Sequence, residues 1–200
     1  MELKTVYFED VAQNHTDETF VLAKKRAEDL GIKSIVLAST SGATGVKAAE
    51  FFKGFNLVVV GLPIGLREAN VALFPDEKRK IIESAGGKVI LSLPAFTTVG
   101  GAPREIFHLH GPGEIIANTL RIFGQGMKVV CEIVLEAADA GYVRSKDPVI
   151  SIGGTGKTKG SDTAVVISPA NSNRFFELRV HEIICKPRLL TVTNASKSVT

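Results

Sequence analysis

This 200-residue chain contains no tryptophan and only two cysteines, and aromatic residues make up 6% of it. Cys131 and Cys185 are too few for a disulfide framework, so we expect a reduced, cytoplasmic protein. The apolar stretch at residues 54–66 is interrupted by Asn56, Pro63 and three glycines, and it is shorter than the ~18 apolar residues of a membrane span. These shortages argue against a secreted disulfide scaffold and against a helical membrane protein.

The chain also has little excess charge of either sign, because its 24 Lys and Arg residues are nearly balanced by 21 Asp and Glu residues. The net charge of +3 comes with no RNA- or DNA-binding signature, so we expect neither a nucleic-acid nor a membrane partner. Residues 1–10 lack the apolar core of a signal peptide. Apolar residues make up 44% of the chain, which fits one globular domain over residues 1–200, with an N-terminal edge segment (1–15) and a frayed tail (188–200).

Short apolar runs alternate with amphipathic segments along the chain. The runs are nearly continuous rather than alternating, which is typical of parallel strands buried on both faces. The predicted strands are residues 34–39, 56–61, 88–93 and 149–153, and the predicted helices are 16–30, 45–53, 75–86, 113–123 and 128–140. This alternation predicts an α/β fold, a three-layer α/β/α sandwich around a mostly parallel sheet.

The first predicted helix and the end of the chain carry clear local signals. We expect Thr16 to cap the helix and Gly31 to end it, with a buried stripe that includes Phe20, Ala23, Ala27 and Leu30. Residues 163–168 and 178–185 flank a turn-rich stretch at 170–173, which predicts an antiparallel hairpin. Residues 4–8 are a candidate edge strand.

The most informative segment is the first loop, residues 39–45, between a predicted buried strand and a predicted helix. A helix cap needs one hydroxyl, whereas this loop offers four. Hydroxyls, a glycine and the free N–H groups of a helix start together favour a bound phosphate. The predicted phosphate ligands are Ser39, Thr40, Ser41, Gly42 and Thr44.

A second loop, residues 153–163, also follows a predicted buried strand and is rich in glycine and hydroxyls. It contains Gly-Lys-Thr at 156–158, but position 151 is serine and a strand follows, so it fails the Walker A pattern. Ligands of open α/β sheets bind at the carboxyl ends of strands where strand order reverses. If the two preceding strands are neighbours, this loop forms a second wall through Gly153, Gly154, Thr155, Lys157, Gly160, Ser161, Asp162 and Thr163.

With these two loops, the sequence resembles the C-terminal α/β domain of pyruvate kinases, in the freestanding form found in archaea and some bacteria. The pattern Ser39-x-Ser41-Gly42-x-Thr44 is similar to the motif that grips a sugar phosphate in the allosteric site of many pyruvate kinases. Residues 160–166 resemble the ligand-covering loop and the last strands of that domain. The resemblance covers about residues 16–168 and implies five strands in the order 3-2-1-4-5, the last antiparallel.

The resemblance also implies a cofactor. Freestanding relatives resemble binders of flavin mononucleotide (FMN), which implies FMN here, with its phosphate at the first loop and the second loop over its ribityl chain and ring. Pyruvate kinase chemistry resides in a (β/α)₈ barrel of ~250 residues, so we expect no pyruvate kinase activity from this chain. We identify no catalytic residue, and a homo-oligomer stays open.

Other functions fit the same residues. Phosphosugar domains of the sugar isomerase type share the SxSGxT signature, but they usually carry an earlier Gly-Ser-Ser-like turn, which is missing before residue 33. A flavin-dependent oxidoreductase and a regulatory module for another chain remain open as well, because sites of this kind serve catalysis and sensing alike.

Several further residues carry weaker signals. Cys131 is expected to be buried and inert, and Glu132, Glu136 and Asp139 to form a solvated or capping face. Asp162 is the carboxylate most expected to act in the site, by orienting Ser161 and Lys157 or by binding a ribityl hydroxyl.

The stretch 97–112 is long for a structureless connection, and a lid or subunit contact and a plain excursion of the chain are both open. Within it, His108 and His110 are expected to be structural rather than metal ligands, and we expect no metal site. Phe96 and Phe107 are expected to be packing residues rather than flavin covers.

Overall fold

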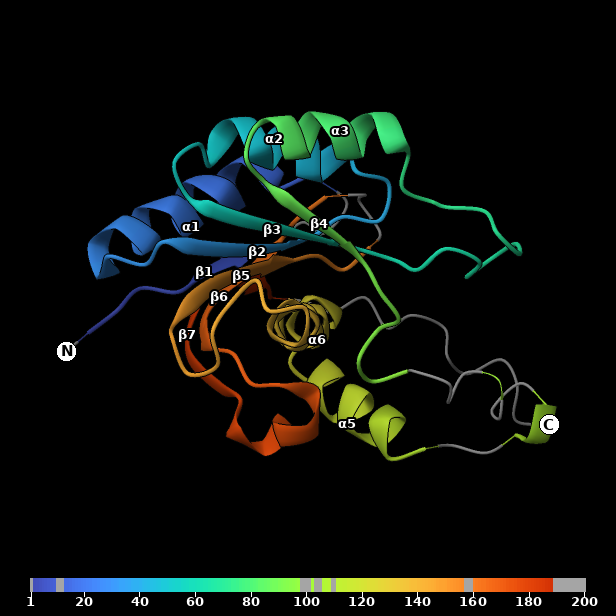
Figure 1. Cartoon of the computed structure of the whole chain (residues 1–200). Coiled ribbons are helices and arrows are strands. Elements are labelled where there is room, and N and C mark those ends of the chain that lie inside the picture. The colour runs from blue at the N-terminus through green and yellow to red at the C-terminus, as the bar shows by residue number, and fades with distance from the viewer. Residues whose placement is uncertain are drawn as a thin grey trace.

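The computed structural model describes residues 2–9, 13–97, 102, 106–108, 111–156 and 160–188. Within these ranges one sheet carries helices on both faces (Figure 1). The strands are β1 (Val6–Phe8), β2 (Ser34–Ala38), β3 (Asn56–Gly61), β4 (Lys88–Leu91), β5 (Val149–Gly153), β6 (Thr163–Ser168) and β7 (Arg179–Pro187). The helices are α1 (Thr16–Leu30), α2 (Ala43–Phe51), α3 (Asp76–Ser84), α5 (Pro112–Arg121) and α6 (Gln125–Asp139), with a 3₁₀ segment, η2 (Ser172–Glu177).

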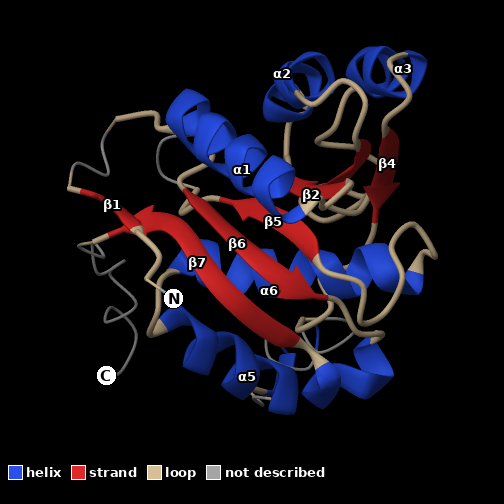
Figure 2. Ribbon diagram, turned by 90° about the vertical axis from the view of Figure 1, so that its left-hand side faces the viewer, coloured by secondary structure: helices blue, strands red, loops and turns tan. Residues whose placement is uncertain are grey.

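The sheet has the order β1-β7-β6-β5-β2-β3-β4. β2 pairs in parallel with β3 and β5, and β3 pairs in parallel with β4. β6 runs antiparallel to both β5 and β7, and β1 lies parallel to β7 at the edge (Figure 2). The predicted order 3-2-1-4-5, the late hairpin and the N-terminal edge strand are therefore confirmed.

The helices form two outer layers, with α1, α2 and α3 on one face of the sheet and α5 and α6 on the other (Figure 1). Alternate residues of each strand enter opposite cores because strand side chains have a period of two. On β2, Ile35 and Leu37 pack with the layer of α1, while Val36 packs with the layer of α6. This arrangement confirms the three-layer sandwich.

Helix α1 has the predicted bounds, but two details of the prediction were wrong. Thr16 is the first helical residue rather than the cap, and its N–H donates to Asn14 Oδ1 at 3.0 Å. Leu30 is 42% exposed and lies outside the buried stripe. Gly31 ends the helix in the left-handed conformation, where the N–H of Ile32 bonds to the Ala27 carbonyl, so Ile32 takes the core position expected of Leu30.

The remaining elements depart from the prediction mainly at their ends. Helix α2 begins at Ala43, two residues earlier than expected, because the first loop itself supplies its N-terminus. The stretch after β6 is the 3₁₀ segment η2 rather than a simple turn, and Asp139 accepts hydrogen bonds from the N–H and the hydroxyl of Ser172 at its start. None of the described helices is long and apolar enough to cross a membrane. The predicted tail lies almost entirely outside the described residues.

Candidate functional site

The two glycine-rich loops leave neighbouring strands at the same edge of the sheet. β2 and β5 pair in parallel, with Leu37 opposite Ile152. The chain continues from β2 to β3 on one side and returns to β5 on the other, so this pair is the switch point of the sheet. The adjacency on which the predicted site depends is confirmed.

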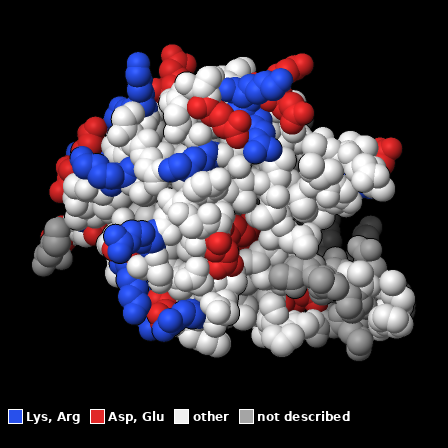
Figure 3. Space-filling view, viewed as in Figure 1, with Lys and Arg blue, Asp and Glu red and all other residues white. Residues whose placement is uncertain are grey.

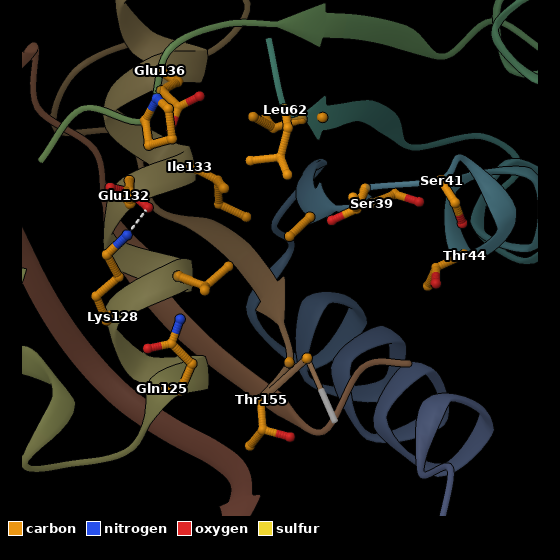
Figure 4. A pocket seen from close by; sticks show the side chains of 18 of the residues that line it. Ser39, Ser41, Thr44, Leu62, Gln125, Lys128, Glu132, Ile133, Glu136 and Thr155 are labelled. Carbon is orange, nitrogen blue, oxygen red and sulfur yellow. Dashed lines mark hydrogen bonds and ion pairs between the residues drawn. The ribbon is translucent and has the colours of Figure 1, made fainter. Parts of the chain in front are cut away.

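A cavity of about 600 Å³ opens at this switch point, within the usual size range of small-molecule sites (Figure 4). Both loops line it. The lining residues from the two loops are Ser39, Thr40, Ser41, Thr44, Gly154, Thr155, Gly156 and Gly160.

The first loop is shaped as a helix N-terminus. The Ser39 hydroxyl accepts a hydrogen bond from the N–H of Gly45 at 3.2 Å and so caps α2, while its own proton can still be donated. The N–H groups of Ala43 and Thr44 lie in the first turn, where helical N–H groups have no intrahelical acceptor. Lys78 Nζ donates to the Ser41 carbonyl at 2.9 Å and fixes the loop from outside. The cavity therefore borders a preformed set of hydrogen-bond donors.

Gly42 shapes this loop without lining the cavity. Its φ of +75° is left-handed, and a Cβ there would lie 2.9 Å from Phe74 Cε1. A residue with a side chain would meet both backbone strain and a steric contact. Gly42, which is predicted as a phosphate ligand, thus allows the turn of the first loop.

The second loop is held by its own carboxylate. Asp162 is buried, and it accepts hydrogen bonds from the N–H of Thr155 at 2.9 Å and from the Thr163 hydroxyl at 2.7 Å. Its N–H donates to the Gly153 carbonyl at 3.0 Å. Asp162 and Thr163 therefore hold the two ends of the loop together and do not line the cavity.

Other members of the predicted set are placed differently. Ser161 contacts α1, because its N–H and its carbonyl bond to the hydroxyls of Thr16 and Thr19. Gly153 ends β5 and packs against the side chains of Val129 and Val130 on α6. Lys157 lies outside the described residues.

The hydroxyl of Thr155 stands out among the groups that line the cavity. Its Oγ1 is buried, and no hydrogen-bond partner for it exists in the described structure. A buried hydroxyl without a partner loses the free energy of its hydration, commonly about 1–3 kcal/mol.

The opposite wall of the cavity comes from α6, none of whose residues is among the predicted site residues. Lys128, Glu132 and Glu136 line the cavity and are only 5–7% exposed, so the solvated face expected for the two glutamates was wrong. Helix α6 is covered along nearly its whole circumference, and its charged residues had no solvent to face. The signal was present: three charges spaced four apart, at 128, 132 and 136, while the other residues from 126 to 138 are apolar or glycine.

Lys128 and Glu132 form a buried ion pair. The other carboxylate oxygen of Glu132 accepts a hydrogen bond from the Phe96 N–H at 3.2 Å, and the Lys128 ammonium lies 5.7 Å from the centre of the Phe96 ring. The positive charge of Lys128 is thus balanced by Glu132 on the same helix. Phe96 is a core residue, as expected.

Glu136 carries the strongest electrostatic perturbation among the cavity carboxyls. Burial raises the pKa of Glu136 to about 7, and the charge of Glu132 adds to this, although a hydrogen bond from the Ser92 hydroxyl acts in the opposite direction. The carboxyl of Glu136 therefore changes protonation state near neutral pH.

Apolar side chains cover the space between the two walls. Val60, Leu62, Pro94, Val129 and Ile133 line it, and Arg67 borders it. Over the helices of the α1 layer, basic and acidic side chains are interspersed on the face shown in Figure 3.

Among the described residues, Cys131 and Phe107 do not line this cavity. Burial raises the pKa of the Cys131 thiol to about 12, which fits the expected inert cysteine. Phe107 is 66% exposed, so its expected packing role was wrong. His110 and most of the candidate lid at 97–112 lie outside the described residues, within which no group of three His, Cys, Asp or Glu side chains could hold a metal.

This chain is similar to pyruvate kinases in two comparisons with known proteins. Two solved pyruvate kinases from Cryptosporidium parvum, one in complex with ADP, are each 14% identical to this chain over 77% of its length, with TM-scores of 0.40 and 0.41. The chain matches only 22% and 23% of the length of those enzymes. The family model described as the pyruvate kinase alpha/beta domain matches residues 17–167, which include both loops and the sheet from β2 to β6. The chain therefore belongs to the pyruvate kinase alpha/beta domain family.

Proposed function

We propose that this chain binds a phosphorylated small molecule, with flavin mononucleotide as the favoured ligand and cofactor. The phosphate would lie at the first loop, where the hydroxyls of Ser41 and Thr44 and the N–H groups at the start of α2 converge. A helix N-terminus provides unpaired donors and a partial positive charge, which is the chemistry that a phosphate dianion needs.

The observation that carries this proposal is that both loops line one cavity at the switch point of the sheet, with the hydroxyl-rich first loop and the start of α2 at one end of it. The apolar side chains of Leu62 and Ile133 suit a planar ring system, and the volume of about 600 Å³ suits a small ligand. The residues present therefore fit FMN.

When bound, FMN would supply redox chemistry. The described residues would hold and position it: the first loop by its donors, and Asp162 by keeping the second loop closed. Binding alone needs nothing more, so a carrier, sensor or regulatory role is as consistent with the site as catalysis.

The test is a fluorescence titration of the purified chain with FMN and with riboflavin, which lacks the phosphate. A hydrogen bond to a charged group contributes about 1.5–3 kcal/mol, so Ser41→Ala and Thr44→Ala should each weaken FMN binding by roughly 10- to 100-fold. Ser84→Ala, which removes an exposed hydroxyl on α3, is the matched control. Equal affinity for riboflavin and FMN would overturn the phosphate site. Binding of a hexose phosphate in place of FMN would keep the phosphate site and reject the flavin.

A further inference from the structure

The cavity has two chemically different ends. Figure 4 shows Ser39, Ser41 and Thr44 on one side and the side chains of α6 on the other, with Leu62 and Ile133 between them. The first side offers neutral donors that suit an anion. The second side presents ionisable groups, which a phosphate site alone does not require.

The packing of the fold does not explain the ionisable end. Buried charged groups often stabilise a protein less than apolar side chains of the same size would. Lys128 already pairs with Glu132, so Glu136 has no cation of its own on α6. The segment after β4 contributes Ser92 and a backbone hydrogen bond from Ala95, both uncharged.

Among the described residues, the remaining charged group that lines this cavity is Arg67, from the connection between β3 and α3. The described charged groups that share the cavity with Glu136 are thus Glu132 and Lys128 on its own helix and Arg67 from that connection. Since the Ser92 hydroxyl donates to one carboxyl oxygen of Glu136, the group is oriented and can accept a further hydrogen bond.

We propose that Glu136 accepts a hydrogen bond from an N–H or O–H group at the end of the ligand remote from its phosphate, and so determines which phosphate esters the cavity takes. This inference rests on the proposed function and narrows its ligand class. The ligand is a phosphate monoester with an apolar body and a donor at its far end. In FMN, the imide N–H of the ring is such a donor.

A proton linkage follows from this role. The carboxylate form of Glu136 is the stronger acceptor for the ligand donor, and that form is a minority below pH 7, since the pKa of Glu136 is raised to about 7. Binding therefore favours release of the Glu136 proton, and affinity rises with pH. Between pH 6 and pH 8 the gain from Glu136 is at most roughly tenfold.

The experiment compares FMN binding by the wild-type chain and by Glu136→Gln at pH 6, 7 and 8. Glutamine keeps the size and an acceptor oxygen but does not titrate, so the part of the rise that comes from Glu136 should disappear. The second ionisation of the FMN phosphate, near pH 6, contributes equally to both proteins. Glu50→Gln, at an exposed position on α2, is the matched control and should keep the rise.

A second probe tests the same bond from the ligand side. FMN methylated at the imide nitrogen keeps the phosphate and the ring but loses the donor, so the wild-type chain should bind it at least roughly tenfold more weakly. Equal pH dependence in Glu136→Gln, or equal affinity for the methylated ligand, would overturn this inference alone. Failure of the wild-type chain to bind FMN at any pH would overturn the FMN proposal and this inference together.

Discussion

The backbone N–H of Ser161 donates a hydrogen bond of 2.9 Å to the Thr16 hydroxyl, which lies 145 positions earlier in the chain. This bond joins the second loop to the first turn of α1. The Thr16 hydroxyl donates in turn to Asn14 Oδ1 at 2.6 Å. One wall of the cavity is therefore held by a residue that belongs to neither loop.

Thr16→Val should destabilise the fold by about 1–3 kcal/mol, because it leaves the buried N–H of Ser161 without an acceptor while keeping the side-chain shape. Urea unfolding measures the loss, and hydrogen exchange at the Ser161 amide should become faster. Thr16→Ser keeps the hydroxyl and should stay close to wild type. Unchanged exchange in the valine variant would show that the bond does not hold the loop.

Gly42→Ala should weaken both the fold and the phosphate site. The new Cβ would lie 2.9 Å from Phe74 Cε1 and 3.0 Å from Lys78 Cβ, at a φ of +75°. Gly31→Ala is a close control, because Gly31 has a φ of +67° and no heavy atom within 4 Å of its Cβ position. The control should lose about 1 kcal/mol from backbone strain alone, and Gly42→Ala should lose more. Calorimetry and FMN titration measure the two effects, and equal losses in both variants would contradict the steric argument.

The contrast between the two walls shows what a sequence can reveal about such a site. The first loop could be predicted because its chemistry is local: four hydroxyls and a glycine follow one buried strand. The adjacency of the loops followed from the strand order of the family it resembles. The α6 wall was missed because Glu132 and Glu136 look like solvent-facing residues until the layers that cover α6 are known. The sequence predicts that Asp162 acts within the second loop. Only its hydrogen bonds show that it holds that loop closed and does not line the cavity.

Both thiols should be unreactive in the folded chain. Burial raises the pKa of Cys131 and that of Cys185 to about 12, and neither side chain is more than 1% exposed. A thiol-specific reagent at pH 8 should therefore label neither cysteine in native buffer and both in denaturant. Labelling of Cys131 under native conditions would mean that α6 opens toward solvent.

Glu136 should make the ligand-free protein less stable as the pH rises. Its pKa is about 7 in the folded chain and ordinarily about 4.5, so between these values the folded state retains a proton that the unfolded state has lost. Stability falls over that window and levels off above it. Glu136→Gln does not titrate, so its advantage in unfolding free energy over wild type should grow by about 2–3 kcal/mol between pH 5 and pH 8.

Urea unfolding of both proteins at the two pH values measures this difference, with Glu50→Gln as the control for the loss of one exposed carboxylate. Parallel stability curves for wild type and Glu136→Gln would mean that Glu136 titrates as it does in the unfolded chain. A growing advantage would show that the chain keeps a buried carboxyl in its cavity at the expense of stability, as is common for groups retained for ligand binding.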